Sequence, residues 1–104
     1  MSGTKKQAAL STRYVTAMRS YLRLRATAAD GEIKDLIHAA RDDLILGGVN
    51  PARANDEADA LIKRAIGTYI KAEFGLDNAD SEKYRAAFKD LKHRLLLSQK
   101  YTAQ

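Results

Sequence analysis

The chain has 104 residues, of which 45% are hydrophobic and 30% are charged, a balance typical of one small globular domain. It has no cysteine, which excludes disulfides and thiolate metal sites, and its two histidines are too few for a histidine-based metal cluster. No apolar run approaches the roughly 20 residues of a membrane-spanning helix. The basic N-terminus lacks the apolar segment of a secretory signal, so we expect an intracellular protein with no membrane contact.

The net charge of +5 is unevenly distributed along the chain. Residues 1–25 carry six basic and no acidic side chains, residues 26–62 carry eight acids against three bases, and residues 63–104 are basic again. A basic segment of this kind can bind polyanions. Patches of opposite charge can also bring copies of one chain together head to tail. Composition leaves both possibilities open.

The spacing of the apolar residues predicts an all-α fold, a small bundle of about four helices with no strand. We expect the helices over residues 12–22, 31–46, 56–74 and 81–97. Strong breaks are predicted at the pair Gly47 and Gly48 and at Gly75, which suits the left-handed position after a helix. The third helix is expected to be central because its apolar residues cover about half of its circumference: Leu61, Ile62, Ala65, Ile66, Tyr69 and Ile70.

Three side chains are expected to cap helix N-termini: Asp30, Asn55 and Asp80. Gly67 falls inside the third helix, where it is either simply tolerated or marks the close approach of a neighbouring backbone. These elements divide the chain into a flexible basic arm over residues 1–11, a single helical domain over residues 12–97 and a flexible C-terminal tail over residues 98–104.

The second and fourth helices each end in three consecutive apolar residues, of which the last, Leu46 or Leu97, should point nearly opposite the core. Either the following segment folds back over these leucines or another chain covers them. A basic segment with interleaved tyrosines could track phosphates, or it could be a solvated helix face. Its arginines are Arg13, Arg19, Arg23 and Arg25.

We find no pattern of residues that indicates catalysis. His38 and His93 are both expected near the polar backs of their helices, either as solvated surface residues or as titratable contacts in an oligomer. No nucleophile or carboxylate group converges on either. We therefore expect no enzyme, no cofactor and no metal site.

Two stretches resemble the tailed-phage head–tail connector family, whose members are also called head-completion adaptors or DNA packaging proteins. The first, residues 21–49, contains an L-R-x-R segment before an E-I-x-D-L-I-x-A-A-x-x-D-L run. The second, residues 59–101, contains A-I-x-x-Y-I-K-A-x-F-G-x-D-N and the closing L-x-S-x-x-Y. The resemblance covers most of the chain, but not the basic N-terminal extension.

This resemblance implies a structural protein of the virion that assembles in the host cytoplasm. Such proteins form a ring of about twelve copies beneath the portal, which extends the DNA channel and offers a platform for the stopper or tail. DNA passes through the channel without sequence-specific binding. The C-terminal segment is commonly the part that docks on the portal. The candidate interface residues are then Arg13, Arg19, Arg23, Arg25, Leu46, Leu96, Leu97, Lys100 and Tyr101.

A second hypothesis is a small DNA-binding module in which the third and fourth helices act like a helix-turn-helix pair. The five basic residues within positions 83–94 favour it. The long connection before Asp80 and the acidic start of the fourth helix, with Asp80 and Glu82, count against it.

Overall fold

The computed structural model describes residues 9–75 and 79–103, and within these ranges it is built of α-helices with no strand. The all-α class predicted from the sequence is confirmed. Four long helices correspond to the four predicted ones, and two single-turn helices lie between or after them. The helices are α1 (Thr12–Tyr21), α2 (Asp30–Gly47), α3 (Pro51–Ala54), α4 (Ala60–Glu73), α5 (Ser81–Leu96) and α6 (Gln99–Thr102).

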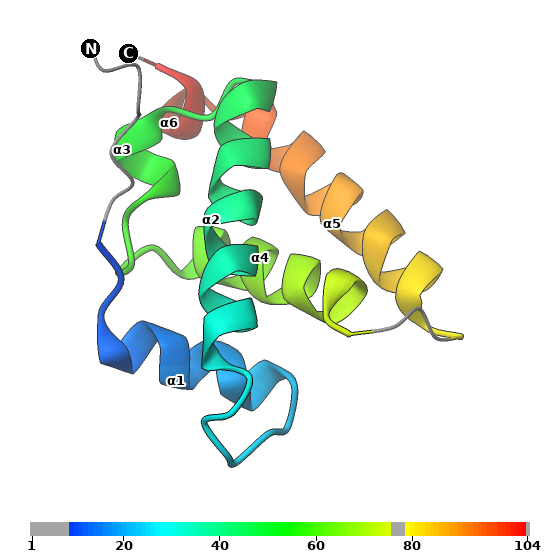
Figure 1. Ribbon diagram of the computed structural model, residues 1–104. Coiled ribbons are helices and arrows are strands. Elements are labelled where there is room, and N and C mark those ends of the chain that lie inside the picture. Colours follow the sequence, from blue (N-terminus) through cyan, green and yellow to red (C-terminus); the bar gives the residue numbers. More distant parts are fainter. Residues whose placement is uncertain (1–8, 76–78, 104) are drawn as a thin grey trace, which may run out of the picture.

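Helix α4 is the central element, as its broad apolar surface predicts. It packs against α1, α2 and α5, while α3 packs on α2 and α6 packs on α5 (Figure 1). Figure 1 shows α5 slanting away from α4 and the short helices α3 and α6 lying together beside the C-terminal end of α2. The edge of one ring meets the face of another between α4 and α5, where Tyr69 and Phe88 have centroids 5.0 Å apart.

The core is a single cluster to which all four long helices contribute. Burial of each large aliphatic side chain contributes roughly 1.5–3 kcal/mol to stability relative to exposure. The completely buried members include Met18, Ile33, Ile37, Leu44, Ile62, Ile66 and Ile70.

The start of the central helix differs from the prediction. Residues 51–54 form their own turn, capped by Asn50, whose side-chain oxygen accepts a hydrogen bond from the backbone N–H of Ala52 at 2.8 Å. Asn55 ends this turn, so the prediction that it caps the N-terminus of α4 is wrong. The cap is Asp59, which accepts from the N–H of Ile62 at 2.9 Å. Several good capping residues occur within ten positions here, and the proline favours the earlier one.

The other two predicted caps also differ from expectation. Asp30 is the first residue of α2, after Ala29 in the cap position, and its carboxylate is bound by Arg19. Asp80 does occupy the cap position of α5, but its side chain makes no capping hydrogen bond. Gly75 has a φ of 68°, the left-handed conformation predicted for it after α4.

The C-terminal segment is packed on the domain, so the prediction that it is flexible is wrong for residues 98–103. Ser98 caps α6 by accepting from the N–H of Lys100. Tyr101 is buried and its backbone oxygen accepts a 2.7 Å hydrogen bond from the N–H of Asn50. The Asn50 side chain also donates to the backbone oxygen of Ala103 at 2.6 Å. Most of the predicted N-terminal arm, residues 1–8, lies outside the described residues.

Candidate functional site

Two leucines at helix ends are among the most exposed apolar side chains of the described chain. Leu46 at the end of α2 is 92% exposed, and Leu97 just after α5 is 75% exposed. Their predicted direction, away from the core, is confirmed, and the segments that follow do not cover them. Leu96, in contrast, packs against the core, where its Cδ2 would lie 3.2 Å from a Cβ on Gly48.

The two helix ends that carry these leucines are tied together. The ammonium group of Lys92 in α5 lies 2.6 Å from a carboxylate oxygen of Asp43 in α2. The Lys92 chain passes so close to Gly47 that a Cβ on this glycine would be 2.7 Å from Lys92 Cε. Leu46 and Leu97 therefore lie at the same end of the molecule, where a partner could cover both.

A groove between α4 and α5 is the second partly apolar surface. Its volume is about 290 Å³ and it is lined by Leu61, Arg64, Leu91, Arg94, Leu95, Ser98 and Tyr101. Leu61 is 51% exposed here, although its place in the apolar pattern of the third helix predicts a core residue. Leu61 does follow the helical spacing of the apolar residues. That spacing alone does not show that no other helix covers this side of α4.

The four arginines of the basic segment do not form one patch. Arg13, Arg23 and Arg25 are exposed. Arg19 is half-buried and binds Asp30 through two hydrogen bonds of 2.9 and 3.1 Å. These hydrogen bonds hold the pKa of Asp30 below its ordinary value and raise that of Arg19. Arg19 therefore joins α1 to α2 inside the protomer.

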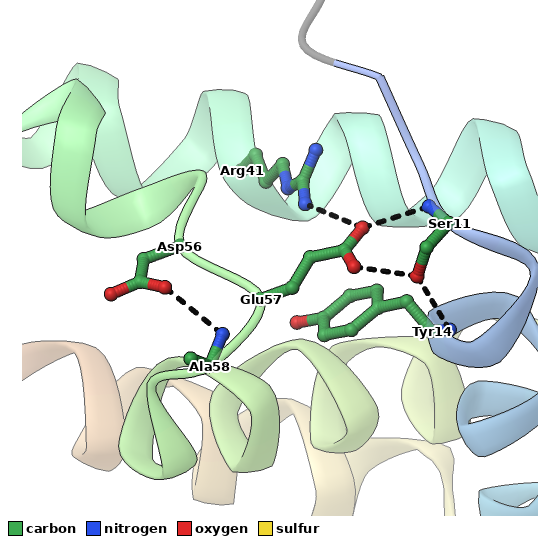
Figure 2. A network of polar contacts seen from close by, with 6 residues as sticks. All are labelled: Ser11, Tyr14, Arg41, Asp56, Glu57 and Ala58. Atoms are coloured by element: carbon green, nitrogen blue, oxygen red, sulfur yellow. Dashed lines mark hydrogen bonds and ion pairs between the residues drawn. The ribbon is translucent and has the colours of Figure 1, made fainter.

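A polar network fixes the start of α1 to the loop before α4 (Figure 2). The Ser11 hydroxyl accepts from the N–H of Tyr14 at 3.0 Å, which caps α1. The same hydroxyl donates to Glu57 at 2.6 Å, and the Ser11 N–H donates to the other carboxylate oxygen at 2.9 Å. Burial raises the pKa of Glu57, but the hydrogen bonds from Ser11 and the charge of Arg41 outweigh it and lower the pKa overall.

Arg41 lies behind this carboxylate and is only 2% exposed. Its Nη2 is 3.9 Å from Glu57 Oε2, and its guanidinium lies 5.6 Å from the ring centroid of Tyr14. Among the described residues, no acceptor forms a hydrogen bond with any of its three side-chain nitrogens, and the Tyr14 hydroxyl also has no partner. Burial raises the pKa of Tyr14 to about 12. The sequence contained a signal for this network, since Arg41 falls on the apolar stripe of α2 beside Ile37 and Leu44.

The histidines do not form a site. His93 is exposed on α5, as expected, whereas His38 is partly buried, and burial together with the charge of Arg41 lowers its pKa. In the part of the chain that the structure describes, no group of three His, Asp or Glu side chains could hold a metal ion. None of the helices described is both long and apolar enough to cross a bilayer.

Tyr101 and Lys100 of the C-terminal segment have different environments. Tyr101 is 4% exposed and its hydroxyl donates to Asp59 at 3.2 Å, so its ring supports the fold. Lys100 is exposed, with its ammonium 5.3 Å from the Tyr101 ring centroid. This segment can therefore offer Lys100 to a partner while Tyr101 holds α6 in place.

The sequence model of the Phage connector protein family matches residues 15–102, from the first turn of α1 to the end of α6. The protein belongs to this family. This match confirms the resemblance to the connector family that two stretches of the sequence indicated. No curated protein and no solved structure matches the chain significantly.

Membership of the connector family makes this protein a phage connector, a component of the virion. The match contains both exposed leucines, the α4–α5 groove and the docked C-terminal helix. It begins after Ser11 and Arg13, so the basic arm before α1 lies outside the family's common part.

Proposed function

We propose that this protein is a head–tail adaptor that assembles beneath the portal as a closed ring of about twelve copies. The ring extends the DNA channel and presents a platform to the stopper or tail, and the protein catalyses no reaction. It assembles in the host cytoplasm and remains at the head–tail interface of the virion. The family match over residues 15–102 is the observation that carries this proposal.

The surface of the protomer supports a role in assembly. The large apolar side chains that remain exposed in the described chain are Leu46, Leu61 and Leu97. Contiguous or paired apolar side chains on the surface of a small domain usually mark an interface, and a ring would bury them in contacts between copies or with the portal. The C-terminal segment around Leu97 and Lys100 is the proposed portal contact.

The charges on α5 argue for passage of DNA without sequence-specific binding, and against the DNA-binding alternative. Two of its five Lys and Arg side chains are paired with carboxylates of other helices: Arg85 with Glu73 and Lys92 with Asp43. A recognition helix needs its basic groups available for phosphates and base edges. Helix α5 instead uses two of them to join the helices of the protomer, and its first turn carries the acidic Glu82.

The mass of the protein with and without its cognate portal tests the proposal. We expect recruitment of about twelve copies to each portal ring, seen as one species of defined mass. Leu97→Asp should prevent recruitment, whereas Ala26→Asp, at an exposed position far along the chain from the C-terminal segment, should not. A chain that ignores the portal and shifts DNA with a steep salt dependence would instead establish the nucleic-acid module.

A further inference from the structure

We propose that neighbouring copies meet head to tail, with the outward face of α2 from one copy lying in the α4–α5 groove of the next. The occupant of the groove is thus a second copy of this chain. The inference rests on the proposed function, since it names the contact that would close the ring. The contact can nevertheless be tested without the portal.

The outward face of α2 is acidic and ends in an exposed leucine. Ile33, Ile37 and Leu44 point into the core, which turns Asp35, Asp42 and Leu46 to the opposite side of the helix. All three of these residues are exposed. Glu32 is also exposed, but its carboxylate accepts a 3.1 Å hydrogen bond from the backbone N–H of Gly75 after α4, so it is engaged within the protomer. His38 on this helix is partly buried, and burial lowers its pKa.

The α4–α5 groove has the complementary character. Leu61 and Leu91 supply apolar surface, and one arginine stands on each side, Arg64 from α4 and Arg94 from α5. Both arginines are exposed. Arg94 is 2.9 Å from Asp90, but both side chains of this pair are solvated, and such pairs contribute little and exchange readily. The groove can therefore accept the carboxylates and the leucine of α2.

The two surfaces lie on different sides of the protomer. Helix α4 packs against α1, α2 and α5, which leaves the side of Leu61 and Arg64 as its outward side. The side of α2 that carries Asp35 and Asp42 faces away from α4, because its opposite side is buried in the shared core. The end of α2 that carries Leu46 contacts Lys92 and Leu96 of α5, whereas the groove is lined by Leu91, Arg94 and Leu95 of that helix. A contact of unlike surfaces repeats in one direction and closes as a ring when the rotation between copies permits it.

Charge and apolar anchor have separate roles in this contact. Leu46, at 92% exposed, has the largest exposed fraction among the large apolar side chains and supplies the anchor, with Leu61 of the next copy as its partner. The carboxylates of α2 and the arginines of the groove set the orientation, since matched charges accelerate encounter and oppose the reversed pairing.

Disulfide trapping tests the contact directly, because the chain contains no cysteine of its own. Leu46→Cys and Leu61→Cys are made as separate proteins and mixed in equal amounts under mild oxidation. We expect the mixed dimer to form about ten times faster than the dimer of Leu46→Cys with the control Ala26→Cys, owing to the raised local concentration. Equal rates would overturn the proposal.

Charge reversal provides a second test that does not depend on cysteine geometry. A variant with Asp35→Lys and Asp42→Lys, and another with Arg64→Glu and Arg94→Glu, should each lose self-association, whereas their mixture should recover it. All four side chains are exposed, so both variants should unfold at the wild-type temperature. Reversal of Lys83 and Lys89, which are exposed on α5 and do not line the groove, serves as the control and should leave association unchanged. Failure of the mixture to recover would reject this pairing.

The two proposals fail in different ways. Rings that form on the portal but yield no linkage between positions 46 and 61 would reject this contact and leave the adaptor function standing. Linkage between positions 46 and 61 in a protein that the portal does not recruit would support the contact and reject the portal function.

Discussion

The ring of Tyr21 occupies the space in which a side chain on Gly67 would begin. A Cβ on Gly67 would lie 2.6 Å from Tyr21 Cε1 and 2.7 Å from Cζ, distances that require one of the two groups to move. The sequence allowed either a tolerated glycine or a close backbone approach at this point. The structure shows a close approach by an aromatic side chain at the end of α1, which packs against the middle of α4.

Gly67→Ala should therefore destabilise the protein. Alanine gains about 1 kcal/mol over glycine inside a helix, but displacing a packed ring typically costs about 1–3 kcal/mol. We expect a net loss of about 1 kcal/mol, measured as a lower midpoint in urea denaturation at unchanged slope.

A Tyr21→Ala background is the control for this substitution. Without the ring, Gly67→Ala should become stabilising, by up to about 1 kcal/mol. If Gly67→Ala has the same effect in both backgrounds, the Tyr21 ring is not what requires glycine at position 67.

The bonds between Ser11 and Glu57 should make stability depend on acid pH. The pKa of Glu57 in the folded protein is below its ordinary value of about 4.5, so its contribution is fully present above that value. The contribution is lost as the pH falls through the lowered pKa. The stability difference between wild type and Glu57→Gln should then shrink as the pH is lowered from neutrality towards 3 in a thermal-melt series.

Ser11→Ala removes the hydroxyl that both caps α1 and donates to Glu57. We expect a loss of about 1 kcal/mol at neutral pH, the usual size for a helix N-cap. Ser20→Ala is the matched control, because the Ser20 hydroxyl bonds only the carbonyl of Thr16 within α1 and this change should be nearly neutral. Equal losses from the two substitutions would count against the role of Ser11 in joining α1 to the loop.

Arg41 should be replaceable by an apolar residue of similar length. Its buried nitrogens have no hydrogen-bond acceptor among the described residues, and its nearest carboxylate is 3.9 Å away. Arg41→Met removes the cost of keeping this charge out of water, so stability should stay within about 1 kcal/mol of wild type or rise.

Glu57→Ala should destabilise the protein, unlike Arg41→Met. It leaves Arg41 buried without its counter-charge and should cost about 3 kcal/mol, but much less when Arg41→Met is already present. Additive effects of the two substitutions in chemical denaturation would show that the ion pair carries no coupling.

The differences between prediction and structure have physical reasons that individual residues illustrate. The phase of a long helix follows from its apolar spacing, so the exposure of Leu46 and Leu97 was predictable. The conformation of the loop before α4 was not predictable, because several of its residues could cap a helix. The tertiary contact of Glu57 with Ser11 favours the loop conformation that is observed. Leu61 was placed in the core because a sequence does not show which side of a helix lacks a neighbour.

The α4–α5 groove and the pairing of Arg41 with Glu57 depend on contacts between segments far apart in the chain. Local spacing therefore predicts only part of the candidate interface. It predicts the exposed leucines Leu46 and Leu97, but not the α4–α5 groove.

Tyr101 illustrates the same limit and provides the last prediction. A four-residue helix has no stability of its own, so α6 depends on the bonds from Asn50 to the backbone of residues 101 and 103 and on the buried tyrosine ring. Tyr101→Phe should lose only the hydrogen bond to Asp59, about 1 kcal/mol. Tyr101→Ala should cost about 3–5 kcal/mol, because it removes a buried ring. Lys100→Ala, at the exposed neighbour, should leave the thermal midpoint unchanged, and a Tyr101→Ala protein as stable as this control would mean that α6 is not part of the folded core.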